Sequence, residues 1–356
     1  MKINFDELKW FGRTIDINNV RYFDYSASGF AFSFTGTKVE CTVLSDPEKF
    51  DGTTKGVIGV YVSEGTDLNW KSLPDELTYR YSLEAQENKC VLFESAEPKT
   101  VTIRVIKLSE VNFGCAGLKE LEIEGQVVPS EFKTDLKMEV IGDSITCGYG
   151  IEGVWEKDTF TTQQERADKS YAFLTAKKLN AELQCCSWSG IGLISKYVDP
   201  ATATKPDTTI SMPLLWPYTD KSLQMRLGME PETWEYSKFQ PDVVIIHLGT
   251  NDASFVQQKE DRRLLYVHQL RVLIEAVHRR SPQAKICCCL GVMGQDLCDS
   301  VSEAVELFKG DFKKAVVKAV KLPVQLESDG IAADWHPSAA THEKVAAQLA
   351  DAIKNW

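Results

Sequence analysis

The sequence predicts two differently built parts: an all-β region over residues 1–130 and a three-layer α/β domain with a mostly parallel sheet over residues 131–356. Length is the first reason, because hydrophobic cores tend to divide beyond about 250–300 residues and this chain has 356. The change of pattern along the chain is the second: short alternating segments come first, and strands alternating with helices follow.

The all-β prediction rests on six apolar or alternating segments that are separated by Gly, Asp, Pro and Asn. They read GFAFSFTG, KVECTVL, VIGVYVSEG, CVLFES, TVTIRVIKL and KELEIEGQVV. Short strands at intervals of roughly ten residues are typical of a β-sandwich, in which alternate side chains are buried between the sheets. Residues 129–136 are predicted to be a linker.

The α/β prediction rests on apolar strands that alternate with segments of helical spacing. The expected strands are MEVIG, LQCCSW, PDVVIIHLG, AKICCCLG and PVQLES, and the expected helices include SYAFLTAKKLN, RRLLYVHQLRVLIEAVHRR, SEAVELFKGDFKKAVVKAV and a last helix. Ligands of such sheets bind beyond the carboxyl ends of the strands. The long segment 199–240 has little strand character and is expected either to cap the site or to form a subunit contact.

Composition narrows the possible partners. A formal net charge of -11 disfavours nucleic acid and anionic membranes. The N-terminus carries no apolar signal-like segment and no run of about 18 apolar residues exists, which predicts a cytoplasmic protein, or a secreted one if a signal segment has been removed. The oligomeric state is open, a homo-oligomer included.

The ten cysteines are predicted to be reduced core residues. Several are adjacent in apolar runs, as at 185–186 and 287–289. Neither they nor the histidines have the spacing of a metal site, so no metal and no other cofactor is predicted.

A nucleophile and its base are predicted at two strand-end turns. Ser144 lies in GDSIT directly after an apolar run, and a serine hydroxyl needs a base within hydrogen-bond reach. Two of the five histidines fall within a long helix, and His247 is expected to be a core residue inside a strand. His336 and His342 remain, and His336 is favoured because AADWHPS directly precedes the last helix.

Two further turns offer hydrogen-bond donors for an oxyanion. Asn251 lies in GTND after the PDVVIIHLG strand, and its side-chain amide is a possible donor. The SGIG turn includes Gly190 and Gly192, where glycine permits close backbone approach and an exposed N–H. Each turn alone is a weak signal.

Together and in this order, GDSIT, SGIG, GTND and DWHPS resemble the four recurring blocks of the SGNH (GDSL-type) hydrolase superfamily. The resemblance implies a flavodoxin-like sheet, a Ser144 nucleophile, a His336 base, and an oxyanion hole formed by the amides of Ser144 and Gly190 with the side chain of Asn251. The β-rich region, KSYAFLTAKKLNAE and SKFQPDVVIIHLGTNDAS resemble carbohydrate esterase family two, in which a jelly-roll domain precedes the hydrolase and whose members deacetylate xylan, glucomannan and related sugars.

The chain departs from the superfamily pattern at one position. Many members carry Asp three residues before the catalytic His, and here that residue is Ala333. Asp334 lies two residues before His336, and residues two apart in an extended segment project to the same side, so Asp334 is the expected third triad member. A backbone carbonyl that holds the histidine is the alternative. Asp143 and Asp252 are expected to brace their turns.

The predicted function is a serine esterase that removes O-acetyl groups from carbohydrate of the xylan, xylo-oligosaccharide or glucomannan type. Four tryptophans in predicted loops of the second part are candidate sugar contacts, namely Trp155, Trp188, Trp216 and Trp335. The partner would be an acetylated oligosaccharide. A lipase or thioesterase of the same superfamily, acting on longer acyl chains, is the alternative.

Overall fold

The first part of the chain is a single, strongly curled antiparallel sheet of eight strands. The computed structural model describes residues 1–46 and 53–356. The strands follow the order β2-β3-β8-β4-β7-β5-β6, and β1 pairs with β4. They are β1 (Lys9–Phe11), β2 (Ile15–Ile17), β3 (Val20–Tyr22), β4 (Gly29–Leu44), β5 (Val57–Glu64), β6 (Tyr79–Ser82), β7 (Glu87–Lys107) and β8 (Gly117–Val128). The prediction of a jelly-roll-like all-β region is confirmed, and its strands form one curled sheet where the sequence suggested two packed sheets.

The three longest strands of this sheet are β4, β7 and β8, and β4 pairs with both of the others along most of its length. The pairing of β4 with β7 and with β8 shifts register between Gly36 and Lys38. A side chain at Gly36 would lie 2.1 Å from the Glu124 carbonyl oxygen, so the bend requires glycine there. This is why segments that the sequence suggested as separate strands, such as GFAFSFTG and KVECTVL, form one strand.

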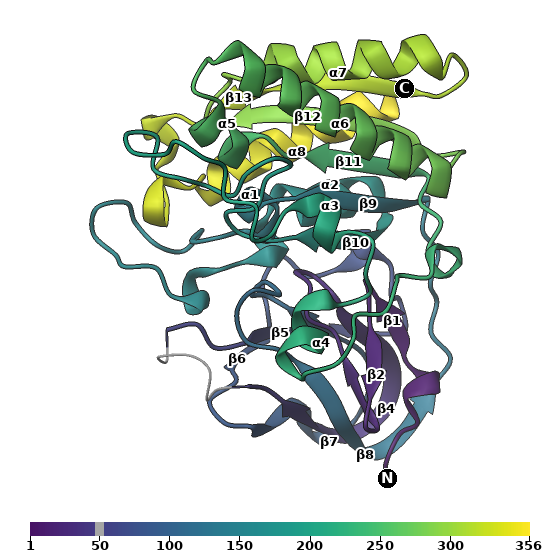
Figure 1. The fold of residues 1–356 in the computed structure, drawn as a ribbon. Helices are drawn as coiled ribbons and strands as arrows, with labels where there is room; N and C mark the ends of the chain where they lie inside the picture. Colours follow the sequence, from purple (N-terminus) through teal and green to yellow (C-terminus); the bar gives the residue numbers. More distant parts are fainter. Residues whose placement is uncertain (47–52) are drawn as a thin grey trace.

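The second part is a five-stranded parallel sheet between two layers of helices (Figure 1). The strand order β10-β9-β11-β12-β13 is the 2-1-3-4-5 order of flavodoxin-like folds. The strands are β9 (Leu136–Gly142), β10 (Ala181–Ser187), β11 (Val243–His247), β12 (Lys285–Val292) and β13 (Val317–Val324). The helices are α1 (Ser144–Cys147), α2 (Tyr171–Leu179), α3 (Met212–Leu215), α4 (Lys221–Arg226), α5 (Thr250–Val256), α6 (Glu260–Arg280), α7 (Cys298–Asp311) and α8 (Ala339–Lys354).

Alternate residues of the central strands pack on opposite faces of this sheet. Cys287 and Cys289 lie in the core with α2 and α8, whereas Cys288 lies in the core with α6 and α7. Neighbouring cysteines therefore point in opposite directions. All ten thiols are free and buried, as predicted.

One expected helix and one expected strand have different bounds in the structure. The helix predicted through 302–320 ends at Asp311, and the following residues Val317–Val324 form β13, parallel to β12. PVQLES lies mostly beyond that strand. The apolar residues of KKAVVKAV (313–320) fit the spacing of a helix and that of a strand. Parallel pairing with β12 makes this stretch a strand from Val317 onward.

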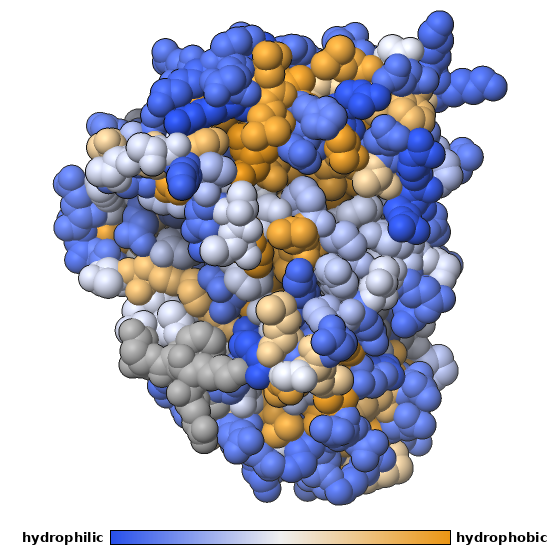
Figure 2. Space-filling view, viewed as in Figure 1, coloured by the Kyte–Doolittle hydropathy of each residue, from blue (hydrophilic) through white to orange (hydrophobic). Residues whose placement is uncertain are grey.

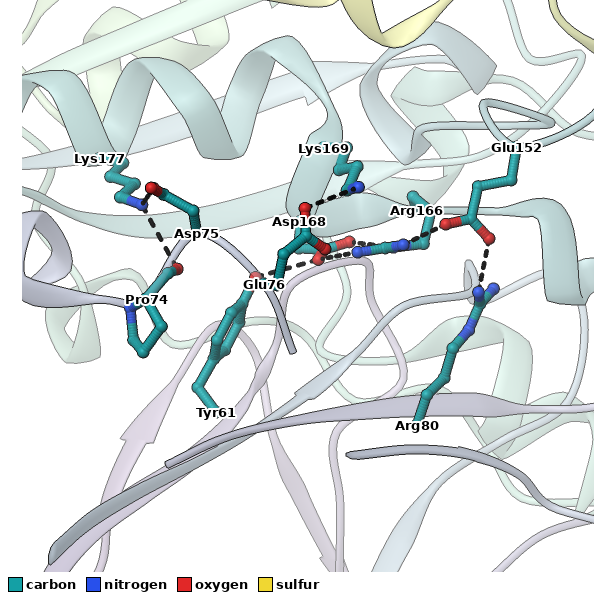
Figure 3. Close-up of polar contacts among 10 residues, drawn as sticks. All are labelled: Tyr61, Pro74, Asp75, Glu76, Arg80, Glu152, Arg166, Asp168, Lys169 and Lys177. Carbon is teal, nitrogen blue, oxygen red and sulfur yellow. Dashed lines mark hydrogen bonds and ion pairs between the residues drawn. The ribbon is translucent and has the colours of Figure 1, made fainter. Parts of the chain in front are cut away.

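The two parts share one hydrophobic core. It joins Phe11, Trp70 and Leu108 of the curled sheet with Phe173 of α2 and Met138 of β9. Polar contacts reinforce the junction: Tyr61 donates to Asp168 at 3.0 Å, and Arg166 binds the same carboxylate (Figure 3).

The segment 199–240 contacts both parts of the chain, and its expected role as a cap or a subunit contact stays a prediction. It contains α3 and α4, and α4 packs on the curled sheet (Figure 1). Arg226 of α4 donates to the carbonyl oxygens of Val111 and Phe113, and Arg13 donates to those of Trp216 and Tyr218. The segment is therefore a brace between the two parts.

Apolar side chains gather on the outer face of α6 and α7 (Figure 2), where Leu264, Leu265, Val272 and Leu307 are exposed. Within residues 1–46 and 53–356, no helix is both long enough and apolar enough to cross a lipid bilayer.

Candidate active site

Ser144 lies at the carboxyl edge of the parallel sheet, where β9 gives way to α1. The carboxylate of Asp143 caps this short helix by accepting the amide hydrogen of Ile145 at 3.0 Å. Burial raises the pKa of Asp143 to about 7. Asp143 thus braces the turn, as expected, and the turn presents the Ser144 hydroxyl.

The structure brings His336 to Ser144. The His336 Nε2 atom lies 2.8 Å from the Ser144 Oγ atom, although 192 residues separate them in sequence. Of the other histidines, His247 is buried within β11, and His342 accepts the Tyr171 amide through Nδ1 at 3.0 Å. The strand-end serine and the loop histidine therefore lie within hydrogen-bond reach, which is the geometry that a serine nucleophile and its base require.

The expectation for Asp334 is corrected by the geometry. The His336 Nδ1 atom lies 3.2 Å from the Ala333 carbonyl oxygen and 3.1 Å from that of Asp334, while the Asp334 carboxylate accepts from the Tyr149 hydroxyl at 2.9 Å. Asp334 and Trp335 both have left-handed backbone conformations, with φ of 50° and 63°. The segment is therefore not extended, and residues 334 and 336 do not project to one side.

The three predicted oxyanion donors surround the same edge. Within the described residues, neither the Ser144 amide nor the Gly190 amide donates to a protein acceptor. Asn251 donates one side-chain hydrogen to the Ile191 carbonyl oxygen at 2.8 Å, which ties it to the loop that carries Gly190. Gly190 itself has a positive φ of 78°.

Asp252 holds the rest of that loop. Its carboxylate accepts the amides of Leu193 and Ile194 at 2.9 and 2.8 Å, and burial raises its pKa to about 6. A side chain at Gly192 would come within 2.7 Å of the Asp252 oxygens, so glycine is required at 192. Asp252 therefore braces the loop, as expected.

An aromatic stack that sequence reasoning missed runs up to the histidine. The Tyr149 ring lies 4.3 Å from the His336 ring and 3.7 Å from that of Phe160, which contacts Phe113 of the first part at 5.6 Å, centroid to centroid. Burial lowers the pKa of His336 to about 4, although the two carbonyl contacts at Nδ1 oppose this effect. No periodicity in the sequence signals such a stack.

The four predicted tryptophans have different positions. Trp335 is 41% exposed and meets the half-buried Trp155 edge to face at 5.3 Å. Trp188 is half-buried. Trp216 is only 3% exposed, and its indole donates to the buried carboxylate of Glu139 at 3.2 Å. The prediction that Trp216 contacts substrate is therefore wrong, because the brace segment folds it into the core.

One buried cluster combines atoms that metals bind. Among the described residues, Glu110, Cys147 and Glu165 place ligand-type atoms within 4.8 Å of one another. The ammonium group of Lys107 donates to the Glu110 carbonyl oxygen at 3.3 Å, and a neighbouring cation disfavours a metal ion. Sequence spacing gave no sign of this cluster.

Comparison with known proteins shows the protein family of this chain. Residues 140–344 match the model of the GDSL-like Lipase/Acylhydrolase family, and this range includes Ser144, Gly190, Asn251 and His336.

Individual relatives show which branch of this family the chain resembles. The structure of a family two carbohydrate esterase from Clostridium thermocellum, in complex with cellohexaose, has a TM-score of 0.81 and 30% identity, covering 98% of both chains. A cellulase/esterase, CelE, from Acetivibrio thermocellus is 39% identical over 65% of this chain, which spans about a quarter (27%) of that relative's length. An acetylxylan esterase / glucomannan deacetylase from Cellvibrio japonicus is 28% identical over 76% of this chain and 72% of that protein. The chain therefore belongs to the GDSL-like lipase/acylhydrolase family and, within it, to carbohydrate esterase family two.

Proposed function

We propose that this chain is a serine esterase that removes O-acetyl groups from carbohydrate of the xylan, xylo-oligosaccharide or glucomannan type. The observation that carries the proposal is the 2.8 Å contact between Ser144 Oγ and His336 Nε2, beside two amides that donate to no protein acceptor within the described residues. A nucleophile–base pair with adjacent oxyanion donors is the arrangement of acyl transfer.

In the proposed mechanism, neutral His336 takes the proton of Ser144 as the hydroxyl attacks the ester carbonyl. The amides of Ser144 and Gly190 and the free side-chain hydrogen of Asn251 stabilise the oxyanion, and the sugar alcohol leaves with the proton from His336. Water, deprotonated by His336, then attacks the acyl carbon; the bond to Ser144 Oγ breaks, acetic acid leaves, and Ser144 Oγ takes the proton back from His336. The carbonyl oxygens of Ala333 and Asp334 hold His336 in the tautomer that accepts at Nε2.

Carbohydrate is proposed as the substrate because relatives of this chain are named for deacetylating xylan and glucomannan, and one was solved with cellohexaose. Exposed aromatic rings stack on the C–H faces of sugars. Trp335, Trp155 and Trp188 are the proposed contacts, and an acetylated oligosaccharide is the proposed partner. We assign the chemistry to a unit over 131–356 that follows a β unit over 1–130.

The test is acetate release from acetylated xylo-oligosaccharides by the wild type and by Ser144→Ala, alongside acetyl and octanoyl chromogenic esters. The expected result is acetate release, preference for the acetyl ester, and loss of both activities in Ser144→Ala. Preference for octanoyl with untouched sugar would replace the proposal by the lipase or thioesterase alternative. Full activity in Ser144→Ala would overturn the serine mechanism.

A further inference from the structure

Glu110 connects the curled sheet to the catalytic edge of the other part. It follows β7 by three residues and is fully buried. Its Oε2 atom accepts the Ser189 amide at 2.6 Å and lies 3.5 Å from the Cys147 Sγ atom of α1. One carboxylate oxygen therefore contacts both the helix that begins with Ser144 and the residue before Gly190.

The position of Glu110 is itself fixed by its surroundings. Its own amide donates to Glu165 at 3.1 Å, and its carbonyl oxygen accepts from Lys107. The segment that carries Glu165 continues into Arg166 and Asp168, whose ion pair is anchored to the curled sheet by Tyr61 (Figure 3). Glu110 thus projects from a rigid junction.

The 189–195 loop is held at its other peptide groups by the catalytic part itself. The Asn251 side chain donates to the Ile191 carbonyl oxygen, and the Asp252 carboxylate accepts the amides of Leu193 and Ile194. The backbone amide of Tyr197 donates to the Gly190 carbonyl oxygen at 2.9 Å. Glu110 alone, among the described residues, accepts the Ser189 amide. Only the two backbone dihedral angles of Ser189 separate that amide from the Gly190 amide.

We infer that Glu110 is a positioning residue for the oxyanion hole: its carboxylate fixes Ser189 so that the Gly190 amide is held where negative charge develops. This inference rests on the proposed function. Burial raises the pKa of Glu110 to about 7. Its Oε2 atom accepts the Ser189 amide both in the carboxylate and in the acid protonated on the other oxygen, and this buried hydrogen bond is not shared with water. The curled sheet thereby contributes to the rate of the reaction without touching substrate.

The experiment compares Glu110→Ala and Glu110→Gln with Glu139→Gln, which alters another buried carboxylate at the junction of the two parts. Two reactions are measured. The first is hydrolysis of 4-nitrophenyl acetate, which gives kcat and KM. The second is the modification of Ser144 by a fluorophosphonate, whose rate is obtained from the intact mass of the protein over time. In the second reaction Ser144 Oγ bonds to phosphorus, fluoride leaves, and His336 takes the serine proton. Thermal unfolding is recorded for each variant.

For Glu110→Ala we expect kcat and the phosphonylation rate to fall about 10 to 100-fold with KM within about threefold, since losing an oxyanion donor outright costs about 100 to 1,000-fold. Glu110→Gln, whose amide oxygen still accepts from Ser189, should lie between Glu110→Ala and the wild type. Glu139→Gln should lose stability but keep both rates.

Equal rates in Glu110→Ala and Glu139→Gln would overturn the inference. If Glu110→Ala does not fold, Glu110→Gln decides, and a rate equal to that of Glu139→Gln overturns it. A wild type that is phosphonylated but leaves acetylated sugar intact refutes the proposed substrate, while the labelling rates still test Glu110. A wild type that is not phosphonylated refutes both.

Discussion

The two parts of the chain differ in how far their contribution to the site depends on local sequence. In the α/β part, Ser144, Gly190 and Asn251 each follow a strand of the same parallel sheet, so topology alone brings them to one edge. From the curled sheet, Glu110 and Phe113 reach that edge only because the junction packs as it does. A motif at a strand end therefore indicates a site from the sequence alone. A supporting residue from a neighbouring part of the chain can be identified only from the tertiary structure.

The junction also differs energetically from the rest of the curled sheet. Arg13 is fully buried, pairs with Glu139 at 3.0 Å and donates to two carbonyl oxygens of the brace segment. Arg21, on the outer strands, makes a paired contact with Asp16, whose side chain is 60% exposed. These two arginines allow the cost of losing the junction to be separated from the cost of losing surface charge.

Among variants that keep Ser144 and His336, the largest effect on the reaction is expected at Asn251. Asn251→Ala removes a side-chain donor from the α/β part, and we expect kcat to fall about 100 to 1,000-fold. The measurement is steady-state kinetics with the acetyl ester. Thr250→Ala is the neighbouring control, because its buried hydroxyl has no protein partner in the described chain. A loss of less than tenfold in kcat for Asn251→Ala would contradict the proposal that this side chain belongs to the oxyanion hole.

The largest effect on stability is expected at Arg13. Arg13→Ala leaves Glu139 buried without its cation, and breaking a buried pair in this way costs about 3–5 kcal/mol. The loss should appear as a lower denaturant midpoint, with kcat per folded molecule unchanged. Arg21→Ala should cost about 1 kcal/mol or less. Equal losses in the two variants would show that the junction is no more sensitive than the surface.

The pH profile is expected to follow His336. The base must be neutral, so kcat/KM rises with pH through its pKa and is level above it. An ordinary histidine has a pKa near 6.5, but burial lowers the pKa of His336 to about 4. We therefore expect the acidic limb well below pH 6.5, measured with an uncharged acetyl ester while circular dichroism monitors folding. A midpoint at or above 6.5 would contradict this burial effect.

The smallest effect is expected at Asp334. Since carbonyl oxygens hold His336 and the carboxylate binds Tyr149, Asp334→Asn should reduce kcat less than about tenfold. Loss of a true triad aspartate costs about 10⁴-fold. Tyr149→Phe, which removes the hydroxyl that donates to this carboxylate, should also reduce kcat less than about tenfold. A loss of about 1,000-fold or more in Asp334→Asn alone would restore the carboxylate as the group that orients His336.

Much of the fold was predictable because it follows from local patterns. The strands β9 to β12 and the helices α2, α6 and α8 were predicted from apolar runs and helical spacing. The end of α7 and the position of β13 were not, since VVKAV fits both structures and only pairing with β12 decides. Trp216 was misassigned for a similar reason: a loop tryptophan is exposed or buried according to what packs on it.

The sequence by itself determined the two-part architecture and indicated the proposed nucleophile, the proposed base and the loops proposed to offer oxyanion donors, because these depend on hydrophobic period and on residues at strand ends. The tertiary structure decided which group orients His336, since two residues in left-handed conformation turn Asp334 toward Tyr149. It also decided that Glu110 accepts the Ser189 amide. Such contacts join residues far apart in the chain, and no local preference encodes them.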